Sequence, residues 1–96
     1  MELTTQQTRT LYALKSQLLR LEAKMSNLNE MMDLSTEVND LDKWKECDNL
    51  WEECNKQHIE LVRIEAESWD IDPCLMLDLI FDREHTLNLL KECNNG

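Results

Sequence analysis

Glycine, proline and aromatic residues are scarce in this sequence of 96 residues. Gly96 and Pro73 are the only glycine and proline, and there are three Trp, one Tyr and one Phe. So little glycine and proline leaves few tight turns, and so few aromatic residues disfavour a sheet. The sequence therefore predicts an all-α fold, with one helical domain over residues 1–96, few connections and a modest core.

Positive charge is also scarce, because 10 Lys and Arg residues face 20 Asp and Glu residues, for a net charge of −10. Nucleic acid and anionic membrane surfaces repel such a chain, so direct binding to either is not expected. The most apolar stretch, residues 74–81, is far shorter than the roughly 20 residues of a membrane span. No apolar run at the start resembles a signal peptide, so a cytoplasmic location with reduced cysteines is predicted.

Residues 11–32 carry the most regular apolar pattern, with steps of three and four residues. Its members are Leu11, Leu14, Leu18, Leu21, Met25, Leu28 and Met32. A seam of period 3.5 lets one helix lie along another over a long distance. Thr4, Thr5 or Thr8 can cap the start of this helix, which is predicted over about residues 5–33.

A second helix is predicted over about residues 40–69, after a break. The first seam would place polar residues at its next core positions, namely Ser35, Asn39 and Asp42. We therefore expect a turn within residues 33–40, with one long continuous helix as the alternative. Two helices of similar length with a short connection indicate a long antiparallel hairpin.

The second helix contains the near repeat WKEC and WEEC. Trp44 and Trp51, like Cys47 and Cys54, are seven residues apart, which is nearly two helical turns. Both pairs should therefore point to one side, and we interpret them as inward-facing packing residues. Three further residues widen the apolar arc to roughly half the circumference: Leu41, Leu50 and Ile59. This helix should then contact two neighbours.

A third helix is predicted over about residues 73–93. Asp72 is a suitable cap, and Pro73 suits the first helical position because its missing N–H would be unpaired there. The polar run DREHT follows an apolar stretch and indicates a possible break near residue 83. The expected architecture is a three-helix bundle with coiled-coil-like packing.

The helices carry more apolar surface than a monomer of this size covers, which favours a homo-oligomer, with a dimer first. The residues expected at the self-association surface are Tyr12, Leu19, Leu75, Met76, Ile80 and Phe81. As an alternative, Tyr12, Trp44 and Trp51 could line a small-molecule pocket between protomers.

A zinc protein or small metal-dependent enzyme is another alternative. Cys54 and His58 are four residues apart on one helix face, and Cys74, His85 or Cys93 could complete a four-ligand site. No C-x-x-C pair is present, so core thiols are the favoured interpretation. Because the sequence also has no nucleophile motif and no phosphate loop, neither an enzyme nor a bound cofactor is expected.

Four carboxylates at steps of three and four would suit Mg²⁺ or Ca²⁺ if they shared one continuous helix. They are Glu30, Asp33, Glu37 and Asp40. The turn expected within residues 33–40 would split this group. We therefore expect a solvated acidic turn there rather than a metal site.

A second set of carboxylates, the acidic row, recurs mostly every seven residues on the second helix. It consists of Asp42, Glu46, Glu53, Glu60 and Glu67. Such a row can imitate a phosphate backbone, and small acidic helical inhibitors, often phage-encoded, resemble this chain in size and charge. Lys56 and Arg63 should neutralise part of the row.

The leading hypothesis is a small acidic protein-interaction module that regulates or inhibits a partner protein. Its size and composition also fit an origin in a phage or mobile element. The alternative within the same class is a nucleic-acid mimic, in which the acidic row blocks a nucleic-acid-binding protein.

Overall fold

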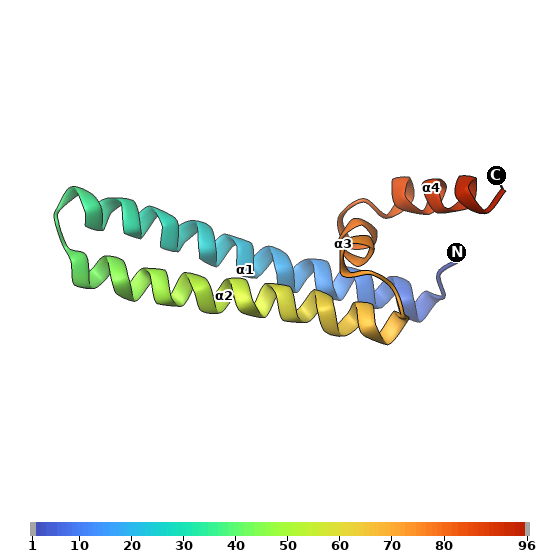
Figure 1. The fold of residues 1–96 in the computed structure, drawn as a ribbon, viewed down its shortest axis with the longest axis horizontal. Helices are drawn as coiled ribbons and strands as arrows, with labels where there is room; N and C mark the ends of the chain where they lie inside the picture. Colours follow the sequence, from blue (N-terminus) through green and yellow to red (C-terminus); the bar gives the residue numbers. More distant parts are fainter. Residues whose placement is uncertain (1, 96) are drawn as a thin grey trace. The chain divides into compact units, whose positions relative to one another are not determined.

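The computed structural model describes the backbone of residues 2–95 and the side chains of residues 2–92. This part of the chain is all-α, with four helices and no strand: α1 (Thr5–Glu37), α2 (Leu41–Trp69), α3 (Pro73–Phe81) and α4 (Arg83–Asn95) (Figure 1). Within residues 2–95, none of these helices is both long enough and apolar enough to cross a membrane.

The chain divides into two units, and each is described separately. Unit 1 comprises Met1–Gln17 and Leu61–Gly96, and unit 2 comprises Leu18–Glu60. Both α1 and α2 contribute to both units, whereas α3 and α4 belong to unit 1 alone.

A capping box formed by Thr4 and Gln7 starts α1. The Thr4 hydroxyl accepts a hydrogen bond from the Gln7 N–H at 3.0 Å, and the Gln7 side chain accepts one from the Thr4 N–H at 2.9 Å. Two backbone donors that the first turn leaves free are thereby satisfied. Of the three threonines that could cap this helix, Thr4 is therefore the one that does.

The turn between α1 and α2 lies in the C-terminal half of the segment where it was expected, residues 33–40. The helix α1 runs to Glu37, and α2 begins at Leu41. Asn39 has a left-handed φ of 59°, and the Asp40 N–H donates to the Ser35 carbonyl at 2.8 Å. This is the hydrogen bond of a Schellman ending, which needs a left-handed residue; asparagine tolerates that conformation. Asp40 then caps α2 by accepting from the Lys43 N–H at 3.0 Å.

Unit 2 is an antiparallel pair of helical segments (Figure 1). Its core cluster consists of Leu28, Cys47 and Cys54, and the partly buried residues packed against it are Leu21, Met25, Met32 and Trp51. The prediction that both thiols point inward is confirmed. The same prediction is wrong for Trp44, whose side chain is 37% exposed.

Ser35 occupies the next core position after Met32, as the heptad register requires, and it is buried. Its hydroxyl donates to the Met31 carbonyl at 2.8 Å. A buried hydroxyl is tolerated when it is hydrogen-bonded in this way. The buried seam of α1 therefore extends past Met32, its last apolar residue, to the polar residue Ser35.

In unit 1, α2 ends at Trp69 with Asp70 in a left-handed conformation at φ 56°. The Ile71 N–H donates to the Ala66 carbonyl at 3.0 Å, again as in a Schellman ending. Asp72 caps α3 by accepting from the Cys74 N–H at 2.8 Å, and Pro73 takes the first helical position. The cap predicted from the sequence therefore forms.

Where one helix over residues 73–93 was expected, the chain forms two. The break falls at Asp82, whose φ of −141° and ψ of 55° are not helical. Its N–H closes the last turn of α3 by donating to the Asp78 carbonyl at 2.7 Å, and its carbonyl accepts from the Thr86 N–H at 3.0 Å. The possible break near residue 83 is thus present, and residues 2–95 form four helices where three were counted.

The core of unit 1 draws on all four helices. Its buried residues are Leu11, Leu14, Val62, Ala66, Met76, Leu79, Ile80 and Thr86. Met76 and Leu79 of α3 have no exposed surface, which explains why this short helix is apolar nearly all round. A helix that is apolar on several sides is stable when other helices surround it.

Candidate interaction surfaces

The apolar arc of α2 in unit 2 is covered on one side only. Leu41, Leu50 and Ile59, which were expected to touch a second neighbour, are 62%, 45% and 55% exposed. Within unit 2, therefore, no second neighbour covers these side chains. An apolar arc that remains open on a helix is a candidate surface for another molecule.

Unit 2 exposes more large apolar side chains than it buries. The eight exposed ones are Leu19, Met31, Leu34, Val38, Leu41, Trp44, Leu50 and Ile59. The four buried apolar ones are Leu18, Leu28, Cys47 and Cys54. Scattered apolar residues are normal on a protein surface, but gathered ones mark interaction sites.

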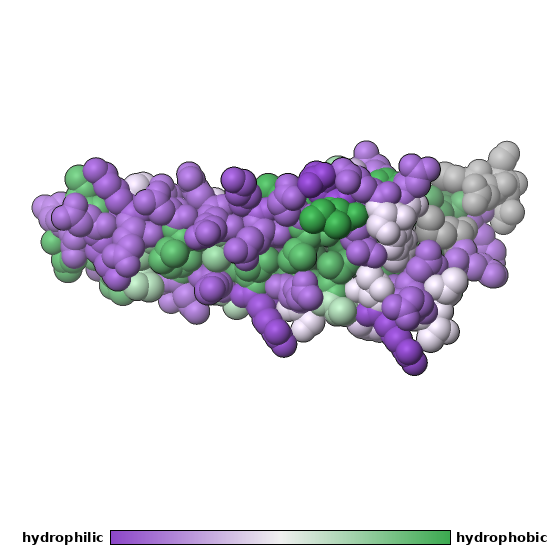
Figure 2. Space-filling view, turned by 90° about the horizontal axis from the view of Figure 1, so that it is seen from below, coloured by the Kyte–Doolittle hydropathy of each residue, from purple (hydrophilic) through white to green (hydrophobic). Residues whose placement is uncertain are grey.

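Five of the eight gather where α1 turns into α2, and we call this set the tip patch. It consists of Met31, Leu34, Val38, Leu41 and Trp44. Val38 is the most exposed, at 73%. Figure 2 shows apolar atoms between hydrophilic ones at this end of unit 2. Sequence reasoning missed Met31 and Leu34 of α1 and Val38 of the turn that follows, although Met31 and Leu34 are three residues apart and therefore share one helix face beside the seam.

A hollow of about 350 Å³ opens at the tip patch. Its lining residues are Ser35, Thr36, Asn39, Asp40, Leu41 and Trp44. Leu41 and Trp44 provide its large apolar side chains, and the end of α1 and the turn after it provide the polar ones. The volume lies at the low end of the range for ligand pockets, roughly 300–1,000 Å³.

Carboxylates alternate along the sequence with the residues of the tip patch. Glu30, Asp33, Glu37 and Asp40 are all exposed, and the turn divides them, as expected, between α1 and the start of α2. The Asp40 carboxylate is used as the cap of α2. Across the described residues, no group of three or more His, Cys, Asp or Glu side chains is arranged to hold a metal ion.

The acidic row lies on α2, and all five of its carboxylates are exposed. Lys43 Nζ is 3.8 Å from Glu46 Oε2, and Arg63 Nη1 is 2.6 Å from Glu67 Oε1. Exposed pairs of this kind contribute little stability, about 0–1 kcal/mol. The row therefore remains a surface on which acidic groups dominate.

The proposed zinc pair does not lie in a ligand cluster. Cys54 is buried in the core of unit 2, and His58 Nε2 is 3.5 Å from Glu22 Oε1. Cys74 and His85 are exposed residues of unit 1, and the side chain of Cys93 lies outside the described residues. Cys54 and His58 are thus placed as a packing thiol and a neighbour of a carboxylate.

The residues expected at a self-association surface divide by burial. Tyr12, Leu19 and Phe81 are exposed, and Leu75 is partly buried. Met76 and Ile80 are buried inside unit 1 and do not reach its surface.

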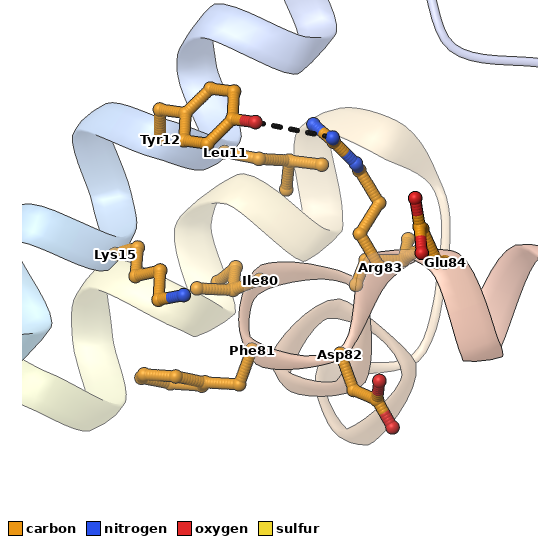
Figure 3. A pocket seen from close by; sticks show the side chains of 9 residues that line it. Leu11, Tyr12, Lys15, Ile80, Phe81, Asp82, Arg83 and Glu84 are labelled. Carbon is orange, nitrogen blue, oxygen red and sulfur yellow. Dashed lines mark hydrogen bonds between the residues drawn. The ribbon is translucent and has the colours of Figure 1, made fainter.

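Tyr12 also has a partner within unit 1. Arg83 Nη2 donates to the Tyr12 hydroxyl at 3.2 Å, and the guanidinium lies 5.0 Å from the centre of the ring (Figure 3). A cavity of about 260 Å³ lies beside this contact, with Lys15 and Phe81 among its lining residues. Tyr12 therefore links α1 to the start of α4, and its ring stays accessible from outside.

Trp51, which was considered as part of a ligand pocket, is partly buried against the core cluster of unit 2. Its indole N–H is buried and makes no hydrogen bond to any described residue. By contrast, the indole N–H of Trp69 donates to Glu65 Oε1 at 2.8 Å. The two side chains thus differ in whether the polar atom of the ring is satisfied.

No protein-family model, curated protein or solved structure is significantly similar to this chain. A function is therefore argued from the surfaces alone.

Proposed function

We propose that this protein is a small acidic helical interaction module that binds a partner protein and thereby regulates or inhibits it. The observation that carries the proposal is the excess of exposed over buried large apolar side chains in unit 2. An antiparallel helix pair of this kind gains stability when a further surface covers its open apolar arc.

The gain from covering that arc is considerable. Fully burying a Leu or Ile side chain contributes roughly 1.5–3 kcal/mol. Leu41, Leu50 and Ile59 are each about half exposed. Covering these three alone would contribute about 2–4 kcal/mol, and the other exposed apolar residues add to this. Such a contribution offsets part of the 4–15 kcal/mol or so that association costs in lost freedom of motion.

The net charge of −10 favours a partner with a basic surface. Opposite charges on two proteins raise the rate of association and select against acidic partners. The apolar residues would then supply affinity, and the carboxylates would supply orientation and speed.

The exposure of all five carboxylates of the acidic row also favours a second candidate, a mimic that occupies a nucleic-acid-binding groove. Charge reversal at Glu46 and Glu53 distinguishes the two functions. A mimic would lose its partner at low salt after both changes, whereas an apolar docking module would keep most of its affinity.

Self-association belongs to the same proposal, with a dimer as the expected state. The exposed side chains of Tyr12, Leu19 and Phe81 support it. Sedimentation equilibrium at about 50 µM, where moderate affinities become visible, should give twice the chain mass of 11.4 kDa. A single species of chain mass would contradict self-association without affecting the binding of another protein.

The main experiment is photo-crosslinking in host lysate followed by reconstitution with the purified partner. Two variants are compared with the unchanged chain: Leu41→Ser with Trp44→Ser, and Leu50→Ser with Ile59→Ser. All four side chains are exposed, so the fold should survive. We expect at least one variant to lose the captured protein. Capture that is equal in all three chains, or no better than with an unrelated acidic helical protein, would refute the proposal.

A further inference from the structure

We infer that the tip patch is the docking site for a basic amphipathic helix of a partner protein. This inference rests on the proposed function and specifies where the partner binds and what its chemistry is. It is carried by three observations on unit 2: the exposed apolar residues, the hollow that two of them line, and the sign of the surrounding charge.

The hollow provides a place for an apolar anchor. Its volume of about 350 Å³ and the exposed ring of Trp44 fit one large aliphatic or aromatic side chain with part of a neighbour. Tryptophan residues at the centre of protein interfaces are frequently the ones whose removal weakens binding most. Leu34 of α1 and Val38 of the turn are also exposed, at 61% and 73%, and offer further apolar surface at this end of unit 2.

The surrounding charge defines the polar side of the partner. Residues 30–46 contain six acidic residues and two basic ones, for a local net charge of −4. One of the two basic residues, Lys43, is already paired with Glu46 at 3.8 Å. A partner that brings apolar groups to the tip must therefore bring positive charge with them.

This charge also excludes the other occupants of an apolar tip. A second copy docked tip to tip would place two surfaces of net charge −4 against each other. Like charges that face each other across an interface weaken binding by several kcal/mol. Nucleic acid and anionic membranes are repelled for the same reason. A basic segment is the occupant whose charge complements this surface.

An amphipathic helix provides both requirements in one element. Apolar residues at spacings of three and four form one face, and Lys or Arg residues flank it. Arginine suits this surface particularly well, because its guanidinium pairs with carboxylates through two hydrogen bonds and stacks on tryptophan rings. Glu37, Asp33 and Trp44 are exposed residues of unit 2 that offer these contacts.

The test uses a pair of synthetic peptides and does not depend on identifying the natural partner. One fluorescein-labelled peptide of about 18 residues, or five helical turns, has a Leu face flanked by Lys and Arg. The second keeps the Leu face and replaces every basic residue with Glu. Fluorescence anisotropy measures the binding of both peptides to the full chain at low and high salt.

Two variants locate the site, each with a matched control. Leu41→Ser with Trp44→Ser removes the apolar walls of the hollow, and Ile64→Ser with Leu89→Ser on α2 and α4 is its control. Asp33→Lys with Glu37→Lys reverses the local charge, and Asp78→Lys with Glu92→Lys on α3 and α4 is its control. All eight side chains are exposed, and circular dichroism verifies that each variant keeps its helices.

We expect the basic peptide to bind, the acidic one not to bind, and each tip variant to lower affinity at least about tenfold. The matched controls should change affinity less than about twofold. The inference would be overturned if the tip variants and their controls lost the same affinity for the basic peptide, or if that peptide did not bind at all. The proposed function would survive if crosslinking still depended on Leu50 and Ile59, so the two failures are distinguishable. Loss of dimers in the tip variants would instead identify a second copy as the occupant.

Discussion

Replacing Trp51 with phenylalanine should leave the protein as stable as before or make it more stable. The indole N–H of Trp51 is buried and has no hydrogen-bond partner among the described residues. An unsatisfied buried donor costs about 1–3 kcal/mol, because it gives up its bond to water on folding. Phenylalanine removes this donor. It also removes three ring atoms from a partly buried side chain, a loss of about 1 kcal/mol.

The expected change for Trp51→Phe therefore ranges from zero to about 2 kcal/mol of added stability. Trp69→Phe is the matched comparison, because its indole N–H donates to Glu65 Oε1 at 2.8 Å. Losing that bond costs about 1 kcal/mol at a partly exposed site, and the smaller ring costs about as much again. The two substitutions should thus differ by at least about 2 kcal/mol, although their chemistry is identical.

Urea unfolding followed by far-ultraviolet circular dichroism measures both variants. The difference in midpoint, at an unchanged slope, gives the difference in the free energy of unfolding. If Trp51→Phe destabilised the protein as much as Trp69→Phe, the Trp51 indole would have to be hydrogen-bonded. An unsatisfied indole N–H in the core of unit 2 would then be refuted.

Three further predictions test the core and the helix ends. In the native protein, iodoacetamide should label Cys74 quickly and Cys47 only on unfolding, because Cys74 is exposed and Cys47 is 1% exposed. Peptide mass spectrometry measures the labelling of each thiol, and equal labelling would contradict the burial of Cys47. Leu18→Ala should cost about 2–5 kcal/mol in thermal or urea unfolding, and Leu19→Ala less than about 0.5, because their exposed fractions are 0% and 48%. Asp70→Gly should add about 0.5–1 kcal/mol of stability and so raise the melting temperature, since glycine adopts a φ of 56° without strain. A lower melting temperature would argue against the left-handed ending of α2.

The helical parts of this fold could be predicted because their signals are local. The seam from Leu11 to Met32 depends on spacing alone, and the cap at Asp72 depends on two adjacent residues. The polar run DREHT indicated a possible break near residue 83, but no glycine or proline marks the break at Asp82. It depends on how α3 is buried, which is a property of the whole of unit 1.

The candidate site was harder to predict, because periodicity identifies apolar faces but not what covers them. The width of the α2 arc indicated a second neighbour, and only the structure reveals that Leu41, Leu50 and Ile59 lack one within unit 2. Trp44 shares the heptad position of Trp51 but lies in the first turn of α2, beside the end of α1. At that position the partner helix is ending, so the same spacing gives less burial.

The three tryptophans make the protein its own optical reporter. Trp44 lies at the surface, Trp51 against the core of unit 2, and Trp69 beside a carboxylate. A neutral quencher such as acrylamide should therefore dim Trp44 first. Any molecule that covers the tip would shield that ring and shift its emission to shorter wavelength, so occupancy could be followed without a dye.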